Sequence, residues 1–239
     1  MSIGEKFELI ADEVYEVGKQ DEYDRFWDGY QPEKGATGNH DRRFAGQGWK
    51  NDTWTPKYSM NVSSAQYMFW ACPVTDIQEY LDKKNLVLKF ESCTNFNQAF
   101  AYCKLNWLRE FGTTSKSANY SGAFTNATNI HTIEKFYVNE KCTFANTFDS
   151  ASALVNLTMV GTIGKSGLNL RWATKLSKAS ISSIIKALST TTSGLTVTLS
   201  KTAVNNAFGI NVDNAATYPE GSEWYELRNS RANWTISFA

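Results

Sequence analysis

The sequence predicts an α/β solenoid of stacked coils of about 24 residues, with short strands, an N-terminal helix and a C-terminal strand–helix–strand cap. The main observation is that Phe100, Phe124, Phe148 and Trp172 follow one another at intervals of 24 residues. A fixed period of roughly 20–50 residues is typical of proteins built from stacked repeats. Two further observations support this fold class: each aromatic residue has similar neighbours, and both ends of the chain change in composition.

Residues 1–30 are expected to form a helix for oligomerisation or attachment. Ser2 and Glu5 make the S-x-x-E pattern that caps the first turn of a helix. The apolar positions of this segment have heptad spacing, which is typical of a helix that packs along one seam: Ile3, Phe7, Ile10, Val14 and Val17. The seam either joins copies of the chain or lies on the body of its own chain.

Residues 31–66 are polar, and Pro32 and Pro56 interrupt regular structure. Four aromatic residues are spread through this connector: Phe44, Trp49, Trp54 and Tyr58. Because an open solenoid needs a cap over its exposed end, we expect the segment to pack over the first coil as an aromatic cap.

Residues 67–175 hold the repeats. A small residue follows each of the first aromatic residues by three positions, and an aliphatic residue comes soon afterwards. The small position is occupied by cysteine in some repeats and by alanine in others. The cysteines are therefore expected to be small buried hydrophobic residues and neither disulfides nor zinc ligands. The expected structural ladder consists of Phe69, Phe100, Phe124, Phe148, Trp172, Cys72, Cys103, Ala127 and Ala151.

Residues 176–239 are expected to form further strand–helix units and a closing cap. Ser177 is placed to cap a helix whose apolar residues have helical spacing: Ile181, Ile184, Ile185 and Leu188. Apolar and polar residues then alternate over 195–199 and again over 234–238, which predicts two half-buried strands.

The charge of the 239-residue chain is balanced, with a formal net charge of +0, so the composition does not favour nucleic acid as a partner. The sequence contains neither a secretory signal pattern nor an apolar run long enough to span a membrane, and we expect synthesis in a cytoplasm. Basic residues without any acidic residue occupy 151–210 and suggest a weak preference for an anionic partner: Lys165, Arg171, Lys175, Lys178, Lys186 and Lys201.

Motifs that carry catalysis are not found. The segment from Thr162 to Ser166 ends in Gly-Lys-Ser, but Met159 stands where a P-loop requires its first glycine. The two histidines, His40 and His131, are far apart in sequence and do not suggest a catalytic triad. The expected protein is therefore not an enzyme, and no cofactor or metal is expected.

Several segments resemble proteins of a known family. The repeat pattern is similar to the surface-antigen class of bacterial leucine-rich repeats. The opening MSIGEKFELIADEVYEVGKQDEYDRFWDGYQ, the segment FAGQGWKNDTWTPKY and the stretch LSKASISSIIKALSTTTSGLTVTLSKTAVNNAF resemble leucine-rich-repeat tail proteins of bacteriophages and prophages of gut Firmicutes. The resemblance implies a virion protein of the tail fibre or baseplate, made in the cytoplasm of the bacterial host.

The expected function is receptor binding at the host surface, with the repeat body as the binding surface. The expected partners are other tail proteins, further copies of the chain (a trimer by analogy with phage tail fibres), and a host cell-wall polymer or surface glycan. Three alternatives stay open: a structural virion component that contacts only tail proteins, a bacterial surface adhesin with the same repeats, and a hydrolase of wall glycans.

The heptad seam yields a direct prediction about oligomeric state. If the seam joins copies, light scattering will give the full chain a mass of a multiple of 26.9 kDa, and a chain that lacks residues 1–30 will be a monomer. A monomeric mass for both proteins would contradict an oligomerising helix.

Overall fold

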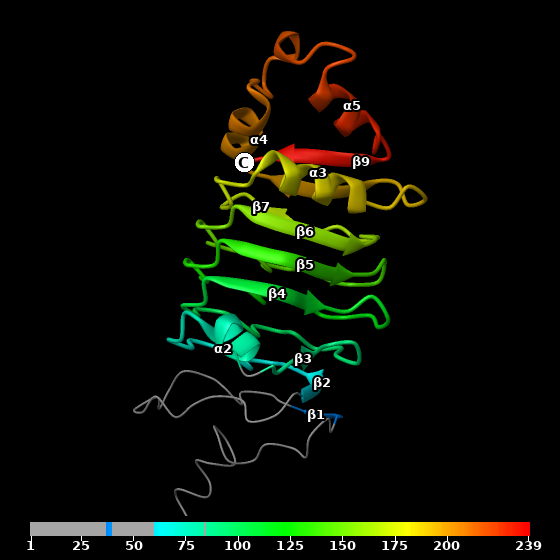
Figure 1. Cartoon of the computed structure of the whole chain (residues 1–239). Coiled ribbons are helices and arrows are strands. Elements are labelled where there is room, and N and C mark those ends of the chain that lie inside the picture. Colours follow the sequence, from blue (N-terminus) through cyan, green and yellow to red (C-terminus); the bar gives the residue numbers. More distant parts are fainter. Residues whose placement is uncertain (1–36, 40–59, 84) are drawn as a thin grey trace, which may run out of the picture.

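The computed structural model describes residues 37–39, 60–83 and 85–239 (Figure 1). The strands within these ranges are β1 (Thr37–Asn39), β2 (Met60–Ser64), β3 (Leu88–Lys89), β4 (Trp107–Gly112), β5 (Thr132–Val138), β6 (Asn156–Gly161), β7 (Asn169–Leu170), β8 (Leu195–Leu199) and β9 (Trp234–Phe238). The helices are α2 (Ile77–Lys83), α3 (Lys178–Ala187), α4 (Lys201–Phe208), α5 (Glu223–Asn229) and the 3-10 helix η2 (Ala215–Thr217).

The expectation of one solenoid of uniform coils is wrong. The described strands form three separate three-stranded sheets, in the orders β1-β2-β3, β4-β5-β6 and β7-β8-β9, and all pairs are parallel. The molecule is a mixed α/β fold in which helices interrupt the succession of strands (Figure 1). A 24-residue period sets the spacing of similar segments, but it does not require their strands to join into one sheet.

Helix α3 ends the central sheet by covering the edge of β6. The hydroxyl Oγ of Ser180 accepts a hydrogen bond from the backbone N–H of Leu157 at 2.8 Å, and Oγ of Ser183 accepts one from the N–H of Met159 at 2.8 Å. The two serines are one helical turn apart, so they meet donors that lie two residues apart on the strand. A helix therefore satisfies backbone groups that another strand would otherwise bind.

Turn segments on the other side of the molecule also pair in parallel. Phe69 N donates to Ala99 O at 2.6 Å, and Phe100 N donates to Ala123 O at 2.7 Å. Phe124 N continues the series by donating to the carbonyl oxygen of Thr147 at 2.8 Å. In each segment the residues two places before and two places after the phenylalanine have positive φ, including Gln98 and Tyr102 around Phe100, Gly122 and Asn126 around Phe124, and Asn146 and Ser150 around Phe148.

This pairing places Phe69, Phe100, Phe124 and Phe148 in one stack. Successive ring centroids are 4.7, 5.5 and 5.4 Å apart, and the ring planes are within 13° of each other. All four side chains are buried. Trp172 does not continue the stack: its side chain is 45% exposed and lies under the guanidinium of Arg171.

A second aromatic stack is formed by the residues four positions before Phe100, Phe124 and Phe148. It contains Phe96, Tyr120 and Phe144, with centroid distances of 4.8 and 5.7 Å. Its central member also ties two strands together, because the Tyr120 hydroxyl donates to Tyr137 O at 2.8 Å and accepts from Thr113 N at 2.9 Å. Burial raises the pKa of this hydroxyl well above its usual range, so it stays protonated and keeps donating.

The predicted C-terminal helix and strands are present. Ser177 is the N-cap of α3, as predicted, and its side chain accepts from Ser180 N. Arg231 holds the other end of this helix by donating from Nε to Leu188 O and from Nη2 to Lys186 O, each at 2.7 Å. A cation at these carbonyls also complements the negative end of the helix dipole.

The aromatic stack leads to a paired stability prediction. Replacing Phe124 with alanine will lower the free energy of unfolding by about 3–5 kcal/mol, because a fully buried ring leaves a cavity. Trp172→Ala, at the next-but-one position of the same sequence period, will cost less than about 1 kcal/mol because its ring is exposed. Denaturant unfolding of both variants is the measurement, and equal losses would contradict the placement of these two rings.

Candidate functional site

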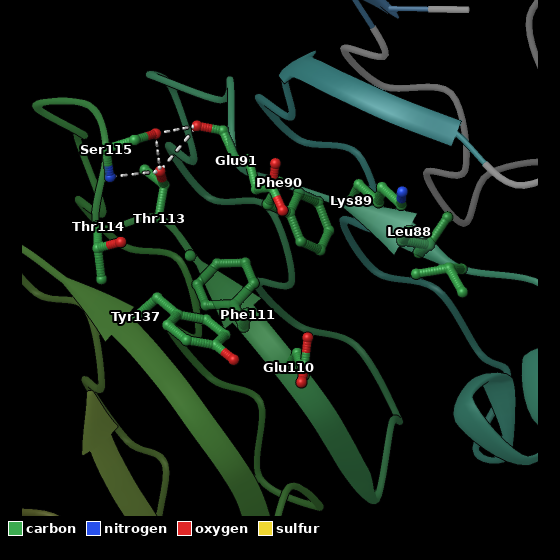
Figure 2. A pocket seen from close by; sticks show the side chains of 12 residues that line it. Leu88, Lys89, Phe90, Glu91, Glu110, Phe111, Thr113, Thr114, Ser115 and Tyr137 are labelled. Atoms are coloured by element: carbon green, nitrogen blue, oxygen red, sulfur yellow. Dashed lines mark hydrogen bonds between the residues drawn. The ribbon is translucent and has the colours of Figure 1, made fainter. Parts of the chain in front are cut away.

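A groove lies where the first sheet gives way to the central one, between residues 87–91 and β4 (Figure 2). We call it the β4 groove, and its volume is about 390 Å³. This is within the range of small-molecule sites in proteins. Its lining consists of Val87, Leu88, Lys89, Phe90, Glu91, Glu110, Phe111, Gly112, Thr113, Thr114, Ser115 and Tyr137.

The floor of the groove is aromatic. Phe90 and Phe111 are both buried, and their rings meet edge to face with centroids 5.7 Å apart. Phe111 also contacts Phe100 and Phe124 of the stack, at 5.5 and 4.9 Å. The aromatic stack therefore supports the floor directly, and the floor cannot move without disturbing the core.

Side-chain hydrogen bonds join the two walls at one end. The hydroxyls of Thr113 and Ser115 both donate to the carbonyl oxygen of Glu91, at 2.8 and 2.5 Å (Figure 2). Gly112 makes the preceding bend with φ +95°, and a Cβ there would collide with the carbonyl oxygen of Tyr137. The bend therefore requires glycine at position 112, where two backbones approach closely, and hydroxyl residues at 113 and 115, which bridge the walls.

Helix α2 lies beside β4 beyond the other end of the groove, where it lines a second cavity. Gln78 Oε1 accepts a hydrogen bond from Arg109 N at 3.1 Å, and the Arg109 guanidinium makes two hydrogen bonds to Asp82, at 2.7 and 2.8 Å. A smaller cavity of about 250 Å³ adjoins this end. It shares four lining residues with the β4 groove: Val87, Leu88, Phe90 and Glu110.

The backbone edge of β4 beside the groove is covered. Arg109 N donates to Gln78 Oε1 of α2. Phe111 is fully buried, so its N–H and C=O are out of reach of a ligand. Beyond the bend at Gly112, Thr113 N donates to the Tyr120 hydroxyl. The strand therefore offers no backbone edge to a ligand.

Charged and hydroxyl groups surround the floor. Glu110 accepts a hydrogen bond from Lys135 Nζ at 2.7 Å, and this bond together with the attraction of the two charges raises the pKa of Lys135. The phenol of Tyr137 points toward Glu110 (Figure 2). Glu91 and Lys89 are exposed and form no ion pair with another described residue. The groove thus combines hydrogen-bond donors and acceptors above an apolar floor.

The structure places the residues of the expected ladder inside the molecule, except for Trp172. The two ladder cysteines, Cys72 and Cys103, and the two alanines, Ala127 and Ala151, are all buried. All four cysteines of the chain are free thiols. Within residues 37–39, 60–83 and 85–239, no group of three or more His, Cys, Asp or Glu side chains is arranged to hold a metal ion.

The six basic residues of 151–210 differ in their partners. Three of them are ion-paired: Arg171 with Asp149 at 3.4 Å, Lys178 with Glu223 at 2.8 Å, and Lys201 with Asp213 at 2.7 Å. The acidic partners come from outside the basic run, which is why the local sequence did not reveal them. The other three, Lys165, Lys175 and Lys186, are exposed and do not line the β4 groove.

The expected oligomerisation seam lies outside the described residues. Ile3, Phe7, Ile10, Val14 and Val17 all belong to residues 1–36. The aromatic connector at 40–59 is likewise outside them. In the part of the chain that the structure does describe, no helix is long and apolar enough to cross a membrane.

The groove residues escaped the sequence analysis because they do not form a motif. Glu110 and Tyr137 come from different strands, and the register that pairs Gly112 with Tyr137 brings them together. The run Thr113-Thr114-Ser115 after a strand was the available signal, since hydroxyl residues at a strand end can bind nearby backbone.

Comparison with known proteins adds no relative, because no protein-family model, curated protein or solved structure matches the chain.

Burial of the cysteines yields a prediction about their reactivity. Removal from water raises the pKa of Cys72 and Cys103 from 9.0 to about 12. The folded thiols therefore stay protonated at pH 8, and a disulfide reagent will label them at least about 100-fold more slowly in the folded protein than in guanidinium, because only the thiolate reacts.

The same raised pKa values imply a pH dependence of stability. Below pH 9 both states hold the thiol proton, and the contribution of these groups to stability is fully present. Between pH 9 and about 12 the unfolded chain loses protons that the folded chain retains, so the free energy of unfolding falls as pH rises. A Cys72→Ala, Cys103→Ala double variant should lose stability less steeply in this range. An equal slope, or rapid labelling of the native protein, would contradict the burial of these thiols.

Proposed function

We propose that the chain is a non-enzymatic protein of a bacteriophage tail or baseplate, and that it binds the host surface through the β4 groove. The phage part of the proposal rests on the resemblance of three segments to tail proteins of Firmicutes phages. In this proposal the protein is made in the bacterial cytoplasm and carried in the virion. Residues 1–30 would then serve for attachment or oligomerisation.

The observation that carries the binding part is the groove itself. A floor of buried aromatic rings supports a rim of exposed charged and hydroxyl side chains in a volume of about 390 Å³. The floor is held by ring contacts to the stack, and the walls are held by the Thr113 and Ser115 hydroxyls. A site whose walls are fixed before binding loses little conformational entropy when a ligand enters.

The basic residues predicted for binding are not used in this proposal as one surface. Arg171, Lys178 and Lys201 each have a carboxylate partner. An exposed pair of this kind is worth little to stability, but it reduces the local positive field that an anionic polymer would feel. The groove is therefore favoured over residues 165–201 as the surface that contacts the host.

A cell-retention experiment tests the proposal. Fluorescently labelled wild-type protein should be retained on host Firmicutes cells. Thr114→Trp, which places a large ring at an exposed lining position, should reduce retention at least about tenfold, as expected when a ligand is excluded from its pocket. Thr128→Trp adds the same ring at an exposed position outside the groove and should leave retention unchanged.

Two outcomes would count against the proposal. Failure of the wild-type protein to bind any plausible host cell would contradict surface binding and favour a structural virion component. Antibodies against the protein would then fail to bind intact virions, because a structural component is covered by other tail proteins. Release of soluble fragments from isolated wall glycan would contradict the non-enzymatic part and favour a hydrolase.

A further inference from the structure

We infer that the β4 groove binds a mono- or disaccharide segment of an uncharged glycan; this inference rests on the proposed function and names the ligand class for the same site. Sugar rings combine an apolar C–H face with a circumference of hydroxyl groups. The β4 groove has a complementary arrangement, with the accessible apolar side chains of Leu88 and Tyr137 beside a rim of polar side chains (Figure 2).

The aromatic contact comes from Tyr137, which is half-buried and has its phenol toward Glu110 (Figure 2). Phe90 and Phe111 are buried and support the groove from beneath. Aromatic residues bury large areas at a low cost in side-chain entropy, and a phenol adds a polar atom at the edge of the ring. Such a surface suits the C–H face of a pyranose.

The polar rim matches hydroxyl groups, each of which can both donate and accept. The carboxylates of Glu91 and Glu110 accept hydrogen bonds, and the ammonium group of Lys89 donates them. The exposed Thr114 hydroxyl can do both. Hydrogen bonds from a neutral hydroxyl to a carboxylate are among the stronger ones, so two acidic side chains can supply much of the affinity.

A peptide strand fits the same edge poorly. Strand addition depends on several successive main-chain hydrogen bonds along an exposed edge. The edge of β4 is occupied at Arg109 by Gln78 and at Thr113 by Tyr120, and Phe111 between them is fully buried. An added strand would therefore find no successive backbone groups of β4 within reach.

A polyanion also fits poorly. Glu91 and Glu110 both line the groove, and like charges would repel a phosphate- or carboxylate-bearing polymer there. Lys135 is already engaged by Glu110, at 2.7 Å. The lining itself contains one basic residue, Lys89, against two carboxylates, so the groove carries no positive excess that would select an anionic glycan.

The experiment combines cell retention with binding to an immobilised array of uncharged oligosaccharides of glucose, galactose and N-acetylhexosamines. Host cells are used untreated, after periodate oxidation, which destroys sugar diols, or after protease treatment. We compare the wild-type protein with Glu110→Gln, which removes an acceptor charge at the groove. Glu134→Gln, an equally conservative change at an exposed neighbouring position outside the groove, is the matched control. Thr114→Trp is a second groove variant, and circular dichroism checks that each variant folds.

The inference expects periodate to abolish cell retention and at least one uncharged oligosaccharide to bind. It expects Glu110→Gln to weaken that binding about tenfold or more, Thr114→Trp to abolish it, and Glu134→Gln to leave it unchanged. Retention that resists periodate but is lost with protease, or binding only to lipoteichoic acid, would overturn the glycan class and leave the proposed function intact. Glycan binding unaffected by either folded groove variant would overturn the groove as its site. No retention of the wild-type protein on host cells would overturn the proposed function itself.

Discussion

Backbone hydrogen bonds between successive turn segments hold the aromatic stack in place, and the remaining elements depend on that stack. A residue of positive φ on either side of Phe100, Phe124 and Phe148 bends each segment so that its ring points inward. The N–H groups of Phe69, Phe100 and Phe124 then each reach a carbonyl of the next segment, and the rings follow at 4.7–5.5 Å. The strands β4, β5 and β6 pair through their own parallel ladders, and Phe111 of β4 contacts the stack and connects it to the floor of the groove.

The period of the sequence identified the stack but not its end. Spacing alone places Trp172 beside Phe148, yet neither Leu170 nor Thr174 has the positive φ that flanks the other rings. Without those two bends the ring turns outward, and the chain proceeds to α3. The second stack of Phe96, Tyr120 and Phe144 has the same period and was available to sequence reasoning. The division into three sheets could not be predicted from the sequence, because it depends on side-chain contacts by Gln78, Ser180 and Ser183.

The candidate site was less predictable than the fold for a similar reason. Its residues are brought together by the register of β4 with β5 and by the boundary between the first and the central sheet. A local sequence motif predicts neither of these. The basic residues of 151–210 show the opposite case, in which a local sequence pattern was visible but incomplete. They are close in sequence, but Asp149, Asp213 and Glu223 pair with three of them from outside the run. A run of like charges predicts the charge of a surface only when no oppositely charged side chains from other segments pair with it.

The serine pair on α3 has a consequence for behaviour in concentrated solution. An uncovered parallel edge strand presents a row of N–H and C=O groups on which another molecule can add its own strand, and fibres and aggregates can grow in this way. The Ser180 and Ser183 hydroxyls occupy two donors of β6, and Ser180 also donates to Val155 O at 3.0 Å. A strand from a second copy would have to displace a whole buried helix to reach them. The central sheet is thus closed to strand addition on this side.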